Sequence, residues 1–183
     1  MRSLFSIILI LSGSLASLKA QDIYKSTGMS IDFFSSAPLE DIEARSGEGI
    51  SLWNTHTGEI SFRVSIRSFD FEKGKMQEHF NENFMESHLY PYATFKGRMQ
   101  VQPDLSRTGE SPVILQGRLQ IHGVEQERNI DALVKVMEEK LELHSRFNVA
   151  VTDHDIRIPK LLFRNIAEVV RVDVNVSYEK LEP

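Results

Sequence analysis

The sequence contains no cysteine. Without thiols the chain forms no disulfide and offers no thiolate nucleophile, no cysteine-ligated zinc site and no iron–sulfur cluster. A lipid-anchored lipoprotein is excluded as well, because its anchor is attached to a cysteine that follows the apolar leader. The fold must therefore depend on packing alone, and a chain of 183 residues is long enough to build one sizeable hydrophobic core.

A long uninterrupted apolar run is also missing. The stretch from Leu4 to Leu18 is shorter than the ~20 residues that a membrane-spanning helix needs, and serines and a glycine interrupt it. Arg2 precedes this stretch and Ala20 follows it, which is the layout of a cleaved secretory signal. We therefore expect a signal peptide over residues 1–20, one domain over residues 21–183, no stable membrane span after cleavage, and a periplasmic or secreted location.

The sequence has no concentration of charge of one sign. Its formal net charge is −5, and acidic and basic residues are interspersed along the chain. A protein that binds nucleic acid usually carries a basic patch or stripe, so nucleic acid is not an expected partner. A homodimer stays open, because the sequence does not fix the oligomeric state.

Catalytic motifs are absent too: there is no G-x-S-x-G and no H-E-x-x-H. The six histidines are scattered, and even His79 and His88 do not have the i, i+4 spacing of a helical metal site. Residues 153–155, Asp-His-Asp, offer groups that could bind a cation, but we interpret them as a solvated loop between a strand and a helix. The sequence thus predicts no enzyme activity, no catalytic residue, no metal site and no cofactor. A metal-assisted hydrolase that uses His79 and His122 is a weaker alternative.

What the sequence does contain is a period of two from Met29 onward. Apolar and polar residues alternate in a series of segments separated by short turns, which is typical of antiparallel sheet with one buried face. This pattern predicts an all-β fold, and it fits a sandwich and a closed barrel equally. The alternating segments are residues 29–33, 60–66, 95–101, 113–121, 130–136, 141–151 and 170–178.

Two segments break this period. Residues 73–91 place Met76, Phe80 and Phe84 four apart, which predicts one or two short amphipathic helices. Residues 158–170 carry Pro159 at a helix-start position and predict another short helix. Both segments are too short to be domains, so we expect them to cap the β structure.

Large apolar side chains are plentiful, with 11 phenylalanines and 6 methionines. An ordinary core explains them, and so does a barrel lumen lined for a long apolar ligand, since about eight strands enclose room for one small ligand. Gly97 and Gly117 lie on the apolar faces of their segments. There a missing side chain leaves clearance for a ligand or marks a bend of the barrel.

Several motifs, taken in order, resemble the YceI-like family of exported proteins. The most specific are "MQEHFNENFMES" followed by "YPYATFKG", with "IHGV" downstream. The segments "MSIDFFSSAPLEDIEARSGEGI" and "DHDIRIPKLLFRNIAEVVRVDV" match as well, so the resemblance covers nearly the whole chain after residue 20. One departure is "EQERNI" after "IHGV", where the family more often has a Thr-Arg or Thr-Lys pair.

The resemblance implies a lipocalin-like antiparallel β-barrel of about eight strands that one or two short helices cap. It also implies a periplasmic protein without established catalytic residues, whose barrel encloses a polyisoprenoid-type chain such as a quinone precursor or a carrier-lipid tail. We therefore expect a carrier or store for such a molecule, and the alternative is a solid barrel that serves as a structural or interaction domain. In "YPYATFKG" we expect Pro91 to end the helical lid and Thr94 to begin a wall strand. The residues expected to line the lumen are Phe62, Val64, Phe80, Phe84, Phe95, Met99, Leu119 and Phe147.

Overall fold

The structure is a computed structural model, and it describes residues 22–138, 140–159 and 166–181. The expected signal peptide therefore lies outside the described residues, and so do residues 160–165 of the segment 158–170 in which a short helix was expected. At the end of that segment, Val169 and Val170 belong to a strand and not to a helix. Among the described residues, no helix is both long enough and apolar enough to cross a membrane.

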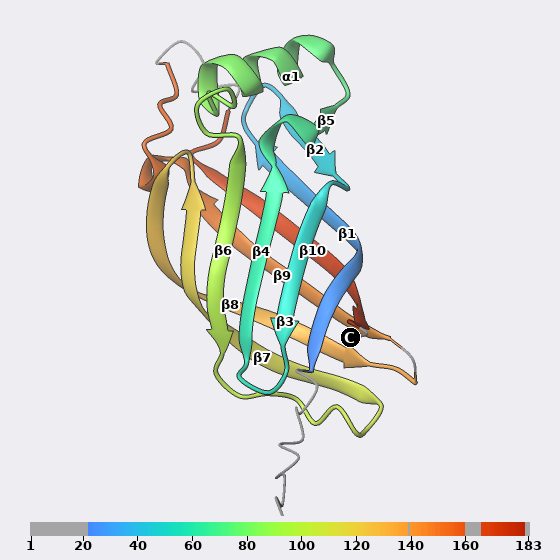
Figure 1. The fold of residues 1–183 in the computed structure, drawn as a ribbon. Helices are drawn as coiled ribbons and strands as arrows, with labels where there is room; N and C mark the ends of the chain where they lie inside the picture. Colours follow the sequence, from blue (N-terminus) through green and yellow to red (C-terminus); the bar gives the residue numbers. More distant parts are fainter. Residues whose placement is uncertain (1–21, 139, 160–165, 182–183) are drawn as a thin grey trace, which may run out of the picture.

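Long antiparallel strands form the body of the molecule (Figure 1). They arise because apolar residues alternate with polar ones, so that each strand buries one face and exposes the other. The strands are β1 (Ile23–Ser36), β2 (Asp41–Ser46), β3 (Gly49–Asn54), β4 (Glu59–Ser65), β5 (Asp70–Phe71), β6 (Tyr92–Met99), β7 (Gly109–Ile121), β8 (Val124–Val136), β9 (Leu141–Ala150) and β10 (Val169–Lys180).

These strands close into a barrel. Their order is β10-β9-β8-β7-β6-β4-β3-β1, and β1 also pairs with β10 along most of its length. The expected antiparallel barrel of about eight strands is therefore confirmed, and closure decides between the barrel and the sandwich.

Two strand positions in the barrel wall are interrupted. β2 and β3 pair with β1 in one common register, so they behave as a single strand broken at Gly47 and Glu48. β5 continues the position of β4 after a short 3₁₀ turn, η1 (Ile66–Ser68), and pairs with β2. The sequence pattern did not reveal β2, β3 or β5, because serines and glycines interrupt the alternation there.

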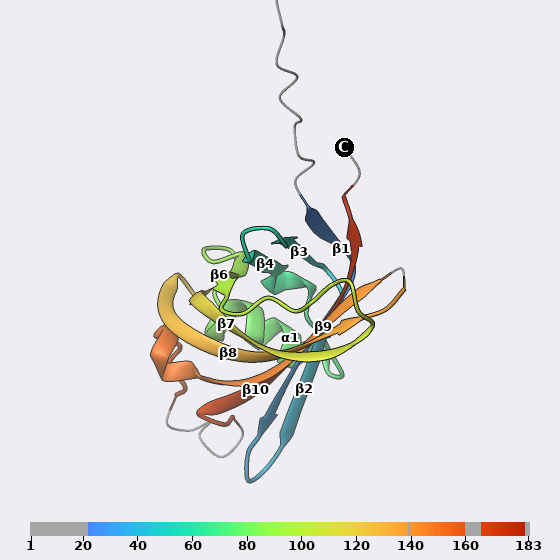
Figure 2. The same ribbon diagram turned by 90° about the horizontal axis from the view of Figure 1, so that it is seen from below.

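One end of the barrel carries helical structure. Helix α1 (Gly74–His79) leads directly into a π-helical turn, η2 (Phe80–Phe84). Seen from the opposite end, α1 lies within the ring of strands, so it covers this opening (Figure 2). The capping helix expected within residues 73–91 is thus confirmed, and we refer to residues 74–85 as the lid.

The other end of the barrel is filled by its own side chains. Trp53 and Tyr178 are completely buried there, with ring centroids 6.0 Å apart, and Met99 is 2% exposed. The Tyr178 hydroxyl lies 2.6 Å from the hydroxyl of Ser51, so the phenol has a polar partner inside this core. Val101, which was expected on the same inward face as Met99, lies beyond the end of β6 and is 75% exposed.

Gly97 and Gly117 are direct partners across β6 and β7. A Cβ added to Gly117 would lie 2.4 Å from the Cα of Gly97 and 2.3 Å from the carbonyl oxygen of Lys96. Both contacts are shorter than real Cβ atoms tolerate. The two glycines therefore allow close approach of two backbones, which favours the curvature explanation over clearance for a ligand.

Gly117→Ala should accordingly destabilise the protein by about 1–3 kcal/mol, because its methyl group overlaps backbone that cannot move aside. Urea unfolding measures the loss. Gly28→Ala is the matched control, since nothing lies within 4 Å of its added Cβ. Equal stability of the two variants would contradict the close-approach explanation.

Candidate functional site

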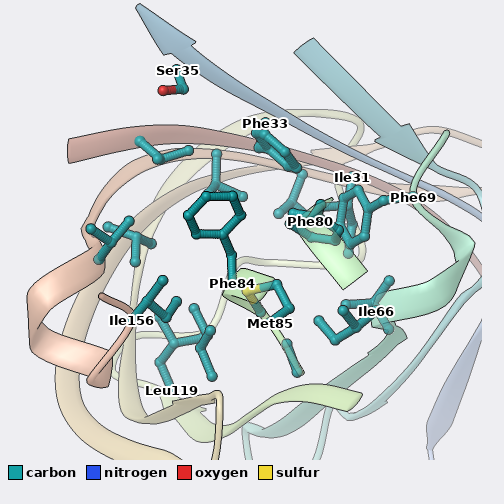
Figure 3. A pocket seen from close by; sticks show the side chains of 18 of the residues that line it. Ile31, Phe33, Ser35, Ile66, Phe69, Phe80, Phe84, Met85, Leu119 and Ile156 are labelled. Atoms are coloured by element: carbon teal, nitrogen blue, oxygen red, sulfur yellow. The ribbon is translucent and has the colours of Figure 1, made fainter. Parts of the chain in front are cut away.

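A cavity of about 370 Å³ occupies the lid end of the barrel. Its wall consists of inward-facing side chains of β1, β4, β6, β7, β8, β9 and β10, and the lid covers it. Figure 3 shows Phe84 projecting into the middle of this space, between the aromatic group around Phe80 and the aliphatic side chains of Leu119 and Ile156. The volume falls in the range of ~300–1,000 Å³ that is typical of ligand sites.

The lining is almost entirely apolar. Its deepest polar group, Ser145, donates its hydroxyl to the carbonyl oxygen of Asp131 at 2.7 Å. Ser35, near the rim, accepts the backbone N–H of Ala167 at 3.0 Å. Both hydroxyls are thus hydrogen-bonded to backbone groups. The rest of the cavity wall is mainly aromatic and aliphatic and suits a hydrocarbon ligand.

The structure brings most of the expected lining residues together. Phe62, Val64, Phe80, Phe84, Phe95, Leu119 and Phe147 all border the cavity. Met99 does not border it and lies in the filled end of the barrel. The expected and the observed lining differ at Met99 because alternation identifies an inward-facing residue but not its height along the barrel.

Sequence reasoning missed part of the lining. Phe33 was seen in the alternating pattern of β1, but nothing in the sequence related it to the lid. Phe69 and Phe71 belong to the short segment "SFDF", which carries too few residues to show a period. Ile156 follows the end of the alternating segment, in a turn whose inward direction only the tertiary structure fixes.

Phe80 holds the beginning of η2 against the barrel. Its ring centroid lies 5.5 Å from that of Phe33, 5.8 Å from that of Phe69 and 4.9 Å from that of Phe71. Aromatic pairs at such distances add about 0.5–1.5 kcal/mol beyond the burial of their area. This cluster is the apolar anchor of the lid.

The π-helical turn sets which lid residues face inward. The N–H of Met85 donates to the carbonyl oxygen of Phe80 at 2.8 Å, a spacing of five residues. That wider turn brings Met85 below Phe80, so both of them and Phe84 line the cavity. π-Helical turns are rare and occur frequently at functional sites.

A polar contact holds the other end of the lid. Glu86 follows Met85 directly, and its Oε2 lies 2.9 Å from Nε2 of His122, in the turn between β7 and β8. Nδ1 of His122 lies 3.2 Å from the carbonyl oxygen of His154, and the imidazole packs against the ring of Tyr90 at 4.5 Å between centroids. Glu86 (φ 42°) and His122 (φ 50°) both have left-handed backbones, so these contacts hold two residues in a disfavoured conformation.

His154 is completely buried, and the expectation of a solvated loop at residues 153–155 is wrong for it. The 3₁₀ turn η3 (Val151–His154) folds the ring under the β7–β8 turn, where Nδ1 donates to the carbonyl oxygen of Val124 at 3.1 Å. Nε2 is buried with no hydrogen-bond partner among the described residues. Burial lowers the pKa of His154 below its ordinary value, because the charged ring would lose its hydration.

The described residues contain no group of three or more His, Asp or Glu side chains that could hold a metal ion. His122, one of the two histidines of the hydrolase hypothesis, has its ring nitrogens directed at Glu86 and at the His154 carbonyl. His79 is an exposed residue of α1 at the rim of the cavity.

Glu86→Ala should loosen the lid. The substitution removes the hydrogen bond to His122, whose loss costs about 0.5–1.5 kcal/mol, while the strained backbone at residue 86 remains. Hydrogen exchange of the amides of residues 76–90 should therefore become faster than in the wild type. Glu82→Ala, at an exposed position of η2, is the matched control. Unchanged exchange in Glu86→Ala would show that the contact does not hold the lid.

His154→Asn should reduce the dependence of stability on pH. Below pH ~6.5 the unfolded chain protonates this histidine. The folded protein does so only at a lower pH, so folding stability falls as pH drops through that interval, by up to ~1.4 kcal/mol per pH unit. The amide of asparagine keeps the donor to Val124 and does not titrate. Urea unfolding between pH 8 and pH 5 measures the slope, and His56→Asn, at an exposed position, is the control. An undiminished slope in His154→Asn would contradict the account.

The fold has known structural relatives. A polyisoprenoid-binding domain from Saccharophagus degradans, implicated in plant cell wall breakdown, has a TM-score of 0.73 and 17% identity, over 86% of this chain and 98% of that one. Burkholderia cenocepacia BcnA has a TM-score of 0.69 and 11% identity, over 81% of this chain and 95% of that one. A Campylobacter jejuni YceI protein has a TM-score of 0.57 and 14% identity, over 74% of this chain and 81% of that one.

Comparison with curated proteins finds no match. The model of the YceI-like domain family, in contrast, matches residues 27–178, which include the whole lid, β2 to β9 and all but the outer ends of β1 and β10. Because this match covers the barrel and its lid, the chain belongs to the YceI-like family.

Proposed function

We propose that this protein binds a long apolar molecule of the polyisoprenoid or quinone type in the lid half of its barrel, and that it acts as a carrier or store of that molecule. The observation that carries the proposal is the cavity itself: about 370 Å³ of space bordered almost entirely by aromatic and aliphatic side chains. Exposing such a surface to water is unfavourable, and a hydrocarbon chain that fills it gains ~0.8 kcal/mol per buried methylene group.

The ligand class has two supports. Glu40, Arg63 and His79 are the charged or titratable residues that border the cavity among the described residues. Glu40 and His79 stand at its rim, and Arg63 is exposed, with its guanidinium 5.1 Å from the centroid of the Tyr92 ring, so the deep part of the lining is uncharged. A chain that presents only uncharged hydrocarbon groups matches such a wall. The structural relative from Saccharophagus degradans is a polyisoprenoid-binding domain, which supports the same class through a shared fold.

A binding role fits the polar groups better than catalysis does. The hydroxyls of Ser35 and Ser145 serve backbone groups, and the most buried histidine, His154, is used to hold a turn. No nucleophile and base stand together at the cavity among the described residues. We infer that the protein is an exported binding protein with a periplasmic or secreted location. The basic residue, apolar stretch and small residue of the proposed signal peptide (1–20) support the location.

Native mass spectrometry of the purified protein, followed by organic extraction, tests this function. We expect an apolar molecule to co-purify and to be released by extraction. The same spectrum counts the chains in each particle and so tests the homodimer. Protein that is consistently empty, and that takes up no added prenyl compound, would overturn the proposal in favour of a structural or interaction domain.

Phe84→Ala should weaken binding of the co-purifying molecule by about tenfold or more, because the ring projects into the middle of the cavity and its contact with the ligand is lost. The amount of extracted ligand per protein chain measures the effect. Leu89→Ala is the matched control, since this side chain follows the lid but is 59% exposed and does not border the cavity. Equal ligand content in both variants would show that the lid does not contact the ligand.

A further inference from the structure

The cavity ends at one level around the whole barrel. On each of several strands the last inward residue that borders it is followed, towards the filled end, by a buried residue that does not. Thus Ile31 borders the cavity and Met29 does not, and Val174 borders it and Val176 does not. The same change occurs on four other strands. Phe62, Leu115, Ile130 and Leu143 border the cavity, whereas the next inward residues towards the filled end do not; these are, in the same order, Ile60, Val113, Ala132 and Leu141.

This level limits the depth available to a ligand. The longest lined stretches run from Leu115 to Ile121 on β7 and from Leu143 to Val149 on β9. At ~3.3 Å per residue each spans roughly 20 Å along the strand. Strands of a barrel tilt by ~35–45°, so the depth along the barrel axis is roughly 15 Å. Because β7 has 13 residues and β1 has 14, the cavity uses only part of the barrel's length.

Phe95 differs from the other residues at this level. Towards the filled end, the next inward residue on its own strand is Gly97, and the partner of Gly97 on β7 is Gly117. Neither residue has a side chain. The ring of Phe95 extends over this bare backbone, since a Cβ at Gly97 would lie 2.8 Å from its tip. The ring therefore fills the volume that the two glycines leave empty. It is 5% exposed, and the ring of Phe62 packs edge-on to it at 6.1 Å between centroids.

The neighbouring residues at this level rest on other side chains. Beyond Leu115 lies Val113, which is 5% exposed, and beyond Leu143 lies Leu141, also 5% exposed. Shortening either of them would open only a local gap above a filled layer. Shortening Phe95 would instead join the cavity to the space above the glycine pair, down to the buried side chain of Met99.

We propose that Phe95, lying over the facing pair Gly97 and Gly117, is the floor of the cavity and sets the length of apolar chain that the barrel accepts. This inference rests on the proposed function and adds a length limit to it. A chain that fits extends from the lid to the Phe95 ring. Any longer chain folds back or leaves its remainder at the lid end, where it gains nothing further from the wall.

A series of all-trans prenyl alcohols tests the floor: geraniol, farnesol, geranylgeraniol and solanesol. Their affinities are measured by displacement of a fluorescent naphthylamine dye from delipidated protein. For the wild type, farnesol should bind at least about tenfold more tightly than geraniol, because each newly buried methylene contributes about fourfold. Geranylgeraniol and solanesol should then bind within about twofold of farnesol.

In Phe95→Ala the limit should move to a longer chain, so that geranylgeraniol binds at least about tenfold more tightly than farnesol. Phe95→Leu, a smaller change of volume, carries the test if the alanine variant fails to fold, and should shift the limit in the same direction. Phe84→Ala is the matched control at the lid, and it should weaken all four alcohols by a similar factor and leave the limit in place.

Three results would overturn the floor. Affinity that keeps rising from farnesol to solanesol in the wild type would show that the barrel has no length limit. An unchanged limit in folded Phe95→Ala and Phe95→Leu would show that another residue sets it. If none of the alcohols displaces the dye from the wild type, the proposed function itself fails, and this result is distinct from the other two.

Discussion

The pairing of β1 with β10 is the constraint on which the rest of the structure depends. It converts a sheet with two open edges into a closed wall, so that every second residue points into a common interior. That interior has to be filled by side chains or by something else. In this protein the chain fills one half with Trp53, Tyr178 and Met99 and leaves the other half lined but unfilled.

The lid follows from the same closure. A barrel end that exposes an apolar cavity needs a cover. If the cover is to open without detaching, one of its two anchors must be weaker than the other. The aromatic anchor around Phe80 buries several rings together, whereas the polar anchor between Glu86 and His122 consists of one hydrogen-bonded pair at a strained backbone. Because a single hydrogen bond contributes less than a packed aromatic cluster, the Glu86 end is the weaker hold on the lid.

Much of this architecture could be predicted from the sequence. The alternation within β4, β7 and β10 indicates strands and their inward faces directly, and the spacing of Phe80 and Phe84 predicts the lid helix. Height along the barrel could not be predicted, because a period of two repeats identically from one end of a strand to the other. Phe95 and Met99 therefore looked equivalent, although only Phe95 borders the cavity. The burial of His154 was hidden for a related reason, since the contact that buries it joins turns far apart in the sequence.

A crystal structure of the protein with farnesol tests the central claim, a barrel that is hollow at the lid end and solid beyond Phe95, most directly. The account predicts elongated ligand density that begins beneath Phe84, runs along the wall strands and ends on the ring of Phe95, with Trp53 and Tyr178 unmoved. Density that passes Phe95 into the opposite end, or a lid half closed by collapsed side chains with farnesol bound outside, would contradict it.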